Sequence, residues 1–178
     1  MKHILFICLG NICRSPMAEA ICQALIQEKG LSAHFSVDSA GTAGYHVGKS
    51  PDRRTLQVLE KHGMETSHLG QKLSPTLLDT FDHLVVMDEA NFEDVHQLYY
   101  DYKKTPPPAE KLFLIRDHDP TTKGVQEVPD PYYENNKAFE NVYQILHRSC
   151  AQMLDYLVDF HQIKLEDGQE EATDSSIE

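Results

Sequence analysis

The chain has 178 residues, of which 40% are hydrophobic and 25% charged, and it contains no Trp. This composition is typical of a soluble globular domain and excludes a collagen-like or wholly disordered chain. The 16 basic and 28 acidic side chains give a formal net charge of −12. Such acidity argues against general binding to nucleic acid or to anionic membrane surfaces, because both depend on Lys and Arg.

Acidic residues are concentrated at the end of the chain. The segment from Leu165 to Glu178 contains six Asp or Glu side chains and no Lys or Arg. We therefore expect one folded domain over residues 1–163 and a solvated, disordered tail over residues 164–178. An acidic docking role for this tail is the alternative interpretation.

No apolar run approaches the roughly 18 residues that a membrane-spanning helix needs. The apolar run at residues 4–7 is too short for the core of a signal peptide. Four cysteines without a secretion signal do not indicate a disulfide framework. We therefore expect a cytoplasmic protein without a membrane partner.

Hydrophobic patterning predicts alternating strands and helices. In chain order, we expect a strand at 2–8, a helix from Ser15 to Gly30, a strand at 35–39, a helix at 52–61, a strand at 82–87, a helix at 89–100, a strand at 111–115 and a helix at 135–162. This alternation predicts an α/β fold with a parallel sheet between helices. Ligands of such sheets bind beyond the carboxyl ends of the strands, so the loop after the first strand is the first candidate site.

That loop contains Cys8 and Arg14, separated by five residues, and leads into a helix at Ser15–Pro16. Backbone N–H groups at a helix N-terminus, together with an Arg, suit a phosphate-sized anion. The same positive environment favours the thiolate form of Cys8, which is a nucleophile. A cysteine that only packs in the core is the alternative. A nucleotide P-loop is excluded because the Gly-Lys-Ser/Thr ending is absent, and zinc is not expected because Cys8 and Cys13 lack a second ligand pair.

The string Cys-Leu-Gly-Asn-Ile-Cys-Arg-Ser-Pro at residues 8–16 closely resembles the low-molecular-weight protein tyrosine phosphatases. The resemblance continues at 37–42, 62–63, 67–68, 81–82, 87–88 and 130–133. It covers roughly residues 3 to 160, which an isolated motif match does not do. It implies a flavodoxin-like, three-layer fold whose four-stranded parallel sheet has helices on both faces, and it implies no cofactor or metal.

The resemblance also implies roles for individual residues. Cys8 would form a phosphocysteine, Arg14 would hold the phosphoryl oxygens, and Asp130 would act as general acid and then as general base. Alone, Asp130 before a proline indicates only a turn. The remaining residues of the implied phosphate-binding loop are Leu9, Gly10, Asn11, Ile12, Cys13 and Ser15.

Further residues would support this loop or shape the substrate pocket. Ser39 and His68 match the family's hydrogen-bond network beneath the loop. Cys13 matches a second loop cysteine that forms a reversible disulfide with the nucleophile. The implied pocket wall consists of Tyr45, His46, Tyr132 and Tyr133. Cys22 and Cys150 lie on apolar helix faces, so we expect them in the core.

An apolar Ile12 and the adjacent tyrosines favour a phosphotyrosyl protein as the substrate, with inorganic phosphate as the product. Protein-arginine phosphatases are an alternative, although they carry Thr at the position of Ile12. Thioredoxin-coupled arsenate reductases share the fold, but they need a resolving cysteine after the third strand, where residues 82–102 contain none. A phosphate- or phosphopeptide-binding module without catalysis is the remaining alternative.

Overall fold

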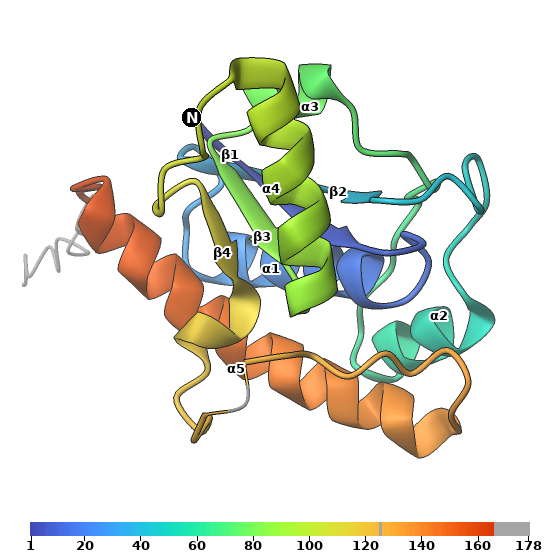
Figure 1. Cartoon of the computed structure of the whole chain (residues 1–178). Coiled ribbons are helices and arrows are strands. Elements are labelled where there is room, and N and C mark those ends of the chain that lie inside the picture. The colour runs from blue at the N-terminus through green and yellow to red at the C-terminus, as the bar shows by residue number, and fades with distance from the viewer. Residues whose placement is uncertain (125, 166–178) are drawn as a thin grey trace, which may run out of the picture.

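A computed structural model describes residues 1–124 and 126–165 of the chain (Figure 1). Within this part, the eight expected strands and helices occur in the expected order, with two further short helices among them. The acidic tail expected over residues 164–178 falls almost wholly outside the described residues.

Four parallel strands form one sheet in the order β2-β1-β3-β4. They are β1 (Lys2–Cys8), β2 (Phe35–Gly41), β3 (His83–Val86) and β4 (Leu112–Leu114). The register pairs Cys8 with Gly41 and Ile7 with Val86, so the carboxyl ends of the three neighbouring strands lie at one edge. The four predicted strands and the parallel sheet are confirmed, with β2 two residues longer than expected.

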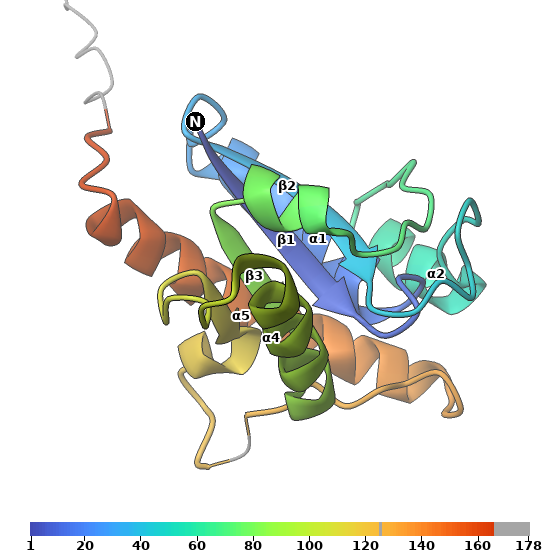
Figure 2. The ribbon, with the colours of Figure 1, turned by 45° about the horizontal axis from the view of Figure 1, so that its top comes forward.

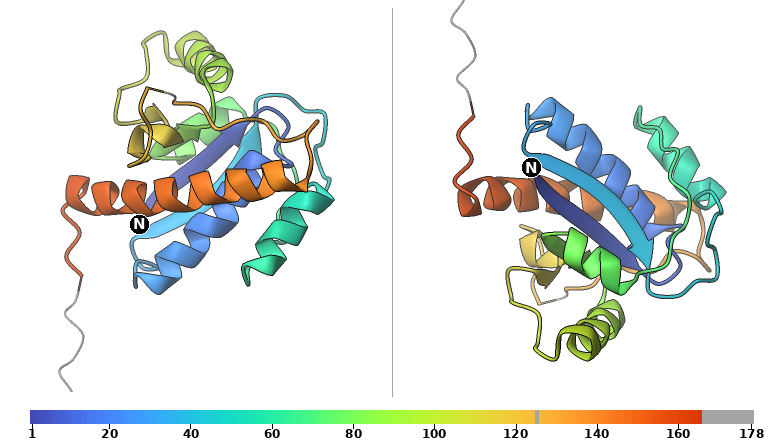
Figure 3. Two further views of the ribbon diagram at one scale, coloured as in Figure 1. Left: turned by 90° about the horizontal axis from the view of Figure 1, so that it is seen from below. Right: turned by 90° about the horizontal axis from the view of Figure 1, so that it is seen from above.

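Successive residues of β1 point to opposite faces of the sheet, as strand geometry requires. Ile4 and Phe6 pack with apolar residues of α1 (Arg14–Glu28) and α5 (Asn136–Phe160). Leu5 and Ile7 pack with those of α3 (Pro75–Thr80) and α4 (Glu89–Lys103). Figure 3 shows these helices on the two sides of the strands, and α2 (Arg53–Lys61) packs against α1 and α5. The three-layer α/β architecture is therefore confirmed.

Two short elements are absent from the sequence-based expectation. The helix α3 has only six residues, too few for a hydrophobic period, although Ser74 caps it and Pro75 begins it. The 3₁₀ helix η1 (Ile115–His118) follows β4 directly and begins at the last residue of the strand expected at 111–115. Its single turn gives no periodic signal either.

The sheet order determines where a ligand can bind. From β1 the chain moves to β2 on one side, and β3 then pairs on the other side of β1. The carboxyl ends of β1 and β3 therefore form the topological switch point of the sheet. Figure 2 shows β1 and β2 pointing toward the end of the molecule where α2 and the segment before α5 lie. Among the described helices, none combines the length and apolar character needed to cross a bilayer.

Candidate active site

The loop between β1 and α1, residues 8–15, is named the Cys8 loop below. Several of its carbonyl groups accept hydrogen bonds from outside the loop or from α1. The accepting carbonyls belong to Cys8, Leu9, Ile12 and Cys13, and the donors are the backbone N–H groups of Thr42, Ala43, Asp52 and Met17. In a planar trans peptide the following N–H points opposite to the carbonyl. The N–H group that follows each of these carbonyls therefore points away from the donors. N–H groups arranged in this way suit an anion.

The sulfur of Cys8 receives two polar contacts inside this loop. The Asn11 backbone N–H donates to Sγ at 3.3 Å, and the Ser15 hydroxyl lies 3.0 Å from it. Ser15 Oγ accepts from Asn11 Nδ2 at 2.8 Å, and its own hydrogen has two acceptors within reach, the sulfur at 3.0 Å and the more distant Ala40 carbonyl at 3.5 Å. Both contacts stabilise a negative charge on the Cys8 sulfur.

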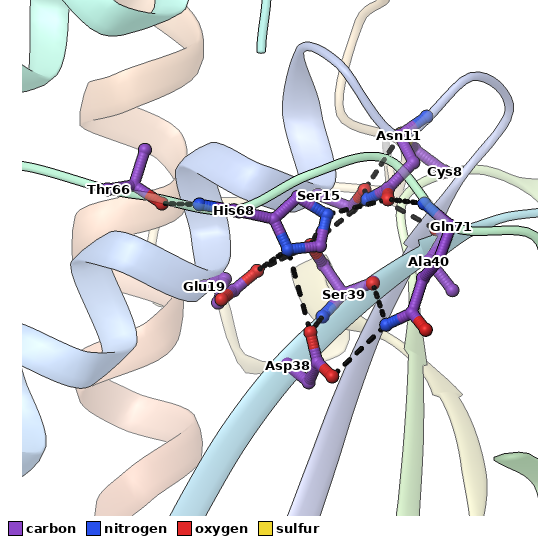
Figure 4. A network of polar contacts seen from close by, with 10 residues as sticks. All are labelled: Cys8, Asn11, Ser15, Glu19, Asp38, Ser39, Ala40, Thr66, His68 and Gln71. Carbon is purple, nitrogen blue, oxygen red and sulfur yellow. Dashed lines mark hydrogen bonds and ion pairs between the residues drawn. The ribbon is translucent and has the colours of Figure 1, made fainter. Parts of the chain in front are cut away.

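Asn11 links the Cys8 loop to a polar network beneath it (Figure 4). Its φ of 56° lies in the left-handed region, which Asn tolerates better than most residues. Asn11 Nδ2 also donates to Ser39 Oγ at 3.0 Å, while Oδ1 accepts from the Gln71 N–H at 2.9 Å and contacts His68 Nε2 at 2.7 Å. Ser39 and His68 thus contact the loop through Asn11, the arrangement that the resemblance implies.

Arg14 is 3% exposed and is held by two acceptors outside the loop. Its Nη1 donates to Asp88 Oδ2 at 2.7 Å and to the Val128 carbonyl at 3.0 Å. Burial alone would lower the pKa of Arg14, but the charges of Cys8, Asp88 and Asp130 raise it above the ordinary value. Arg14 therefore remains a cation beside the sulfur, oriented before any ligand arrives.

Asp130 reaches the site from the segment of residues 126–134, named the Asp130 segment below. Its Oδ2 lies 3.7 Å from Arg14 Nη2, and its Oδ1 accepts from the Tyr132 N–H at 3.2 Å. The Asp130 side chain is 45% exposed. It is thus close to the cation of the Cys8 loop and open to solvent.

A cavity of about 330 Å³ joins these groups. Its lining residues are Cys8, Leu9, Gly10, Ile12, Cys13, Arg14, Tyr45, His46, Asp130, Tyr132 and Tyr133. The structure thus brings together all the expected loop, acid and pocket residues except four. Asn11 and Ser15 belong to the loop but direct their side chains into the polar network, and Ser39 and His68 lie beneath the loop. The Tyr133 side chain is 93% exposed, so it contributes to the mouth of the cavity and not to a deep wall.

The four cysteines differ sharply in surroundings, although all are free. Burial, with the charges of Asp52 and Cys8, raises the pKa of Cys13 to about 12. Cys13 is therefore a neutral thiol, and its pairing with Cys8 stays a prediction. Cys22 and Cys150 are completely buried in the core, as expected.

Three site residues escaped sequence reasoning. Asp88 follows β3 at the carboxyl edge, which is the signal that could have indicated it. Val128 gives no such signal, yet its N–H donates to the Met87 carbonyl at 2.8 Å while its carbonyl binds Arg14. Arg54 donates to the carbonyls of Tyr132 and Glu134, each at 2.9 Å, and so holds the Asp130 segment.

Comparison with known proteins agrees with this geometry. A family model described as low molecular weight phosphotyrosine protein phosphatase matches residues 3–166. The human protein of that name is 38% identical over 154 residues, which are 86% of this chain and 94% of the human one. A protein tyrosine phosphatase structure from Entamoeba histolytica has a TM-score of 0.81 and 34% identity, covering 90% of this chain and 99% of its own.

A Drosophila arginine phosphatase structure is similar to nearly the same degree. It has a TM-score of 0.80 and 33% identity, and the match covers 94% of this chain and all of that one, 100%. Sequence, fold and the arrangement of Cys8, Arg14 and Asp130 lead to one conclusion. The chain belongs to the low molecular weight phosphotyrosine protein phosphatase family.

Proposed function

We propose that this chain hydrolyses phosphotyrosine in proteins, and small aryl phosphates, through a phosphocysteine at Cys8 and without a metal ion. The observation that carries the proposal is that Cys8, Arg14 and Asp130 line one cavity of about 330 Å³. Nucleophile, phosphate-binding cation and general acid thus reach the same ligand.

In the first step, the Cys8 sulfur attacks phosphorus while the bond from phosphorus to the tyrosine oxygen breaks. That oxygen keeps the electron pair of the bond and takes a proton from the Asp130 carboxyl group. Arg14 and the N–H groups of the Cys8 loop bind the three equatorial oxygens, where charge is redistributed.

In the second step, Asp130 is a carboxylate and takes a proton from a water molecule. The water oxygen attacks phosphorus, the bond from phosphorus to sulfur breaks, and inorganic phosphate leaves. The Ser15 hydroxyl, 3.0 Å from the sulfur, stabilises the thiolate that departs. The first step thus uses Cys8 as a thiolate and Asp130 in its protonated form.

Side chains at the mouth of the cavity favour an aryl substrate. Ile12, Tyr45 and Tyr132 give an apolar lining above the Cys8 loop. Such a lining fits the ring of phosphotyrosine, whose phosphate can then reach the sulfur. A protein-arginine phosphatase remains the second candidate, because the Drosophila arginine phosphatase shares 33% of aligned residues with this chain.

The proposal places the enzyme in the cytoplasm, because the mechanism requires Cys8 as a free thiol and reducing compartments keep thiols free. All four cysteines are free in the structure. The partner would be a tyrosine-phosphorylated protein. The net charge of −12 supports the expectation that neither nucleic acid nor an anionic membrane is a partner.

The test compares phosphate release from phosphotyrosine and phosphoarginine peptides in the presence of EDTA. We expect tyrosine-selective release by the wild type and none by Cys8→Ser. Arginine-selective release would contradict the substrate assignment and leave the cysteine mechanism intact. Absence of release from both peptides would favour arsenate reduction or phosphate binding.

A further inference from the structure

Beneath the Cys8 loop, three side chains from different elements converge. Glu19 comes from α1, Asp38 from β2, and His68 from the loop after α2 (Figure 4). His68 Nδ1 lies 3.1 Å from Glu19 Oε2 and 3.6 Å from Asp38 Oδ1. One ligand atom from each residue lies within 4.8 Å of the other two.

Hydrogen bonds on the other side of His68 determine which ring nitrogen carries a proton. Asn11 Oδ1 accepts from the Gln71 backbone N–H, so this atom is the amide oxygen. His68 Nε2, 2.7 Å from that oxygen, must therefore donate to it. In a neutral ring, Nδ1 then has its lone pair directed at the two carboxylates. A metal-binding histidine has this arrangement, with its other N–H bound to an oxygen.

The spacing from His68 Nδ1 to each of the two carboxylate oxygens matches that around a tetrahedral ion, and the ligand atoms of Glu19 and Asp38 lie within 4.8 Å of each other. With zinc bonds of about 2.0–2.1 Å to nitrogen and oxygen, neighbouring ligand atoms lie about 3.3 Å apart. The observed 3.1 and 3.6 Å bracket that value. Glu19 Oε2 accepts from Ser39 Oγ and Asp38 Oδ1 from the Ser39 N–H. Each oxygen keeps a second lone pair for a metal.

Solvent reaches this cluster from two directions. The Asp38 side chain is 40% exposed. Glu19 also lines a groove of about 330 Å³ between α1 and residues 63–67, separate from the cavity of Cys8. A hydrated ion can therefore approach without passing through the candidate active site.

We propose that Glu19, Asp38 and His68 form a zinc-binding site that stabilises the network beneath the Cys8 loop. Zinc occupies the space between the three ligand atoms and keeps water in its fourth position. His68 Nε2 continues to donate to Asn11, so the ion fixes the ring that supports the loop. The ion takes no part in the reaction at Cys8, which stays metal-independent.

The electrostatics of the cluster favour a dication. Ligand atoms of Glu19 and Asp38 lie within 4.8 Å of each other. Two carboxylates this close repel each other, and a dication bound between them offsets that repulsion.

The test is calorimetric titration of Zn²⁺ into the full-length Cys8→Ser protein, in which the thiolate cannot compete for the metal. We expect one site whose affinity falls at least tenfold in Glu19→Gln and in Asp38→Asn, both made in the Cys8→Ser background. Zn²⁺ should also raise the melting temperature of the parent and not that of the two variants. Weak binding of Zn²⁺ to carboxylates outside the proposed site is the same in the parent and in the variants, so it does not affect the comparison.

A matched control uses a close pair of histidines elsewhere in the fold. His83 Nε2 and His161 Nε2 lie 2.8 Å apart, far along the chain from this cluster. His161→Gln in the Cys8→Ser background should leave the zinc affinity unchanged. Equal affinity in the Glu19 and Asp38 variants, loss of the site in His161→Gln, or equally tight binding of Mg²⁺ would each overturn the proposal. Because the parent has no nucleophile, these outcomes are independent of the proposed function.

Discussion

The Cys8 loop and the Asp130 segment line the same cavity but are held in place differently. The Cys8 loop is mostly buried, and its side chains bond to one another and to Ser39 of β2, in the network beneath the loop. The Asp130 segment is exposed and is held at separate points: Val128 bonds to the end of β3, and Arg54 bonds the carbonyls of Tyr132 and Glu134. Substitutions in the loop should therefore abolish chemistry, whereas those at the anchors should reduce it by degrees.

The largest effect is expected for Cys8→Ser. Because a hydroxyl at this position is a far weaker nucleophile than a thiolate, kcat should fall by more than about 10⁴-fold. The loop amides and Arg14 remain, so the variant should still bind phosphate, which equilibrium dialysis with inorganic phosphate can measure. Activity within tenfold of the wild type would contradict the assignment of the nucleophile.

The substitution Asp130→Asn tests the role of the general acid separately from that of the nucleophile. We expect kcat on a phosphotyrosine peptide to fall by about 10²–10⁴-fold, because the tyrosine oxygen then leaves without a proton. With para-nitrophenyl phosphate the loss should be much smaller, since nitrophenolate is a good leaving group. Equal losses on the two substrates in steady-state assays would argue against general-acid catalysis by Asp130.

Upstream of the Asp130 segment, Asp119 connects η1 to α5. Its fully buried carboxylate accepts from Arg116 and Arg148 and from Thr121. Although burial alone would raise it, hydrogen bonds from Arg148 and Thr121 hold the pKa of Asp119 well below its usual range. Asp119→Asn should lower the free energy of unfolding by about 2–4 kcal/mol at pH 7, because it removes the charged acceptor of the half-buried Arg116 and Arg148 side chains.

The pH dependence of that loss follows from the depressed pKa. The contribution of Asp119 to stability is fully present above the unfolded-state pKa of about 4 and is lost as the pH falls through the lower folded-state value. The difference between wild type and Asp119→Asn in urea unfolding should thus shrink between pH 4 and pH 2. A difference independent of pH would refute the ionic role of Asp119.

The smallest effect is expected where Arg54 anchors the Asp130 segment. Arg54→Gln removes the bonds to the Tyr132 and Glu134 carbonyls, so Asp130 should reach the leaving oxygen less often. We expect about a tenfold lower kcat on phosphotyrosine and little change on para-nitrophenyl phosphate. The matched control is Arg53→Gln, which removes the same charge from an exposed neighbour and should change neither rate.

If Arg54→Gln lowered both rates equally, Arg54 would act on the Cys8 loop and not on the acid. Such a result is physically conceivable because Asp52, which binds Arg54, also donates its N–H to the Ile12 carbonyl at 2.7 Å. The loss of kcat on phosphotyrosine, compared with the loss on para-nitrophenyl phosphate, therefore decides whether Arg54 positions the Asp130 segment or the Cys8 loop.

The sequence by itself determined the order of the strands and helices, the parallel sheet and the family resemblance. These follow from local patterns: runs of apolar residues, glycine and proline at element ends, and a nine-residue string around Cys8. Cys8 and Arg14 were predictable because they lie in one loop between a strand and a helix. Asp130 was indicated only by its resemblance to a family motif, since an Asp before Pro has no local signature of catalysis.

Only the tertiary structure decided what surrounds these residues. Arg14 meets Asp88 and Val128 across separations of 74 and 114 residues, and Arg54 meets the Asp130 segment across about 80. No local pattern encodes such contacts, because they depend on which strands become neighbours and which backbone carbonyls face the site. The convergence of Glu19, Asp38 and His68 has the same origin: sheet pairing and helix packing place three ordinary polar residues within reach of one ion.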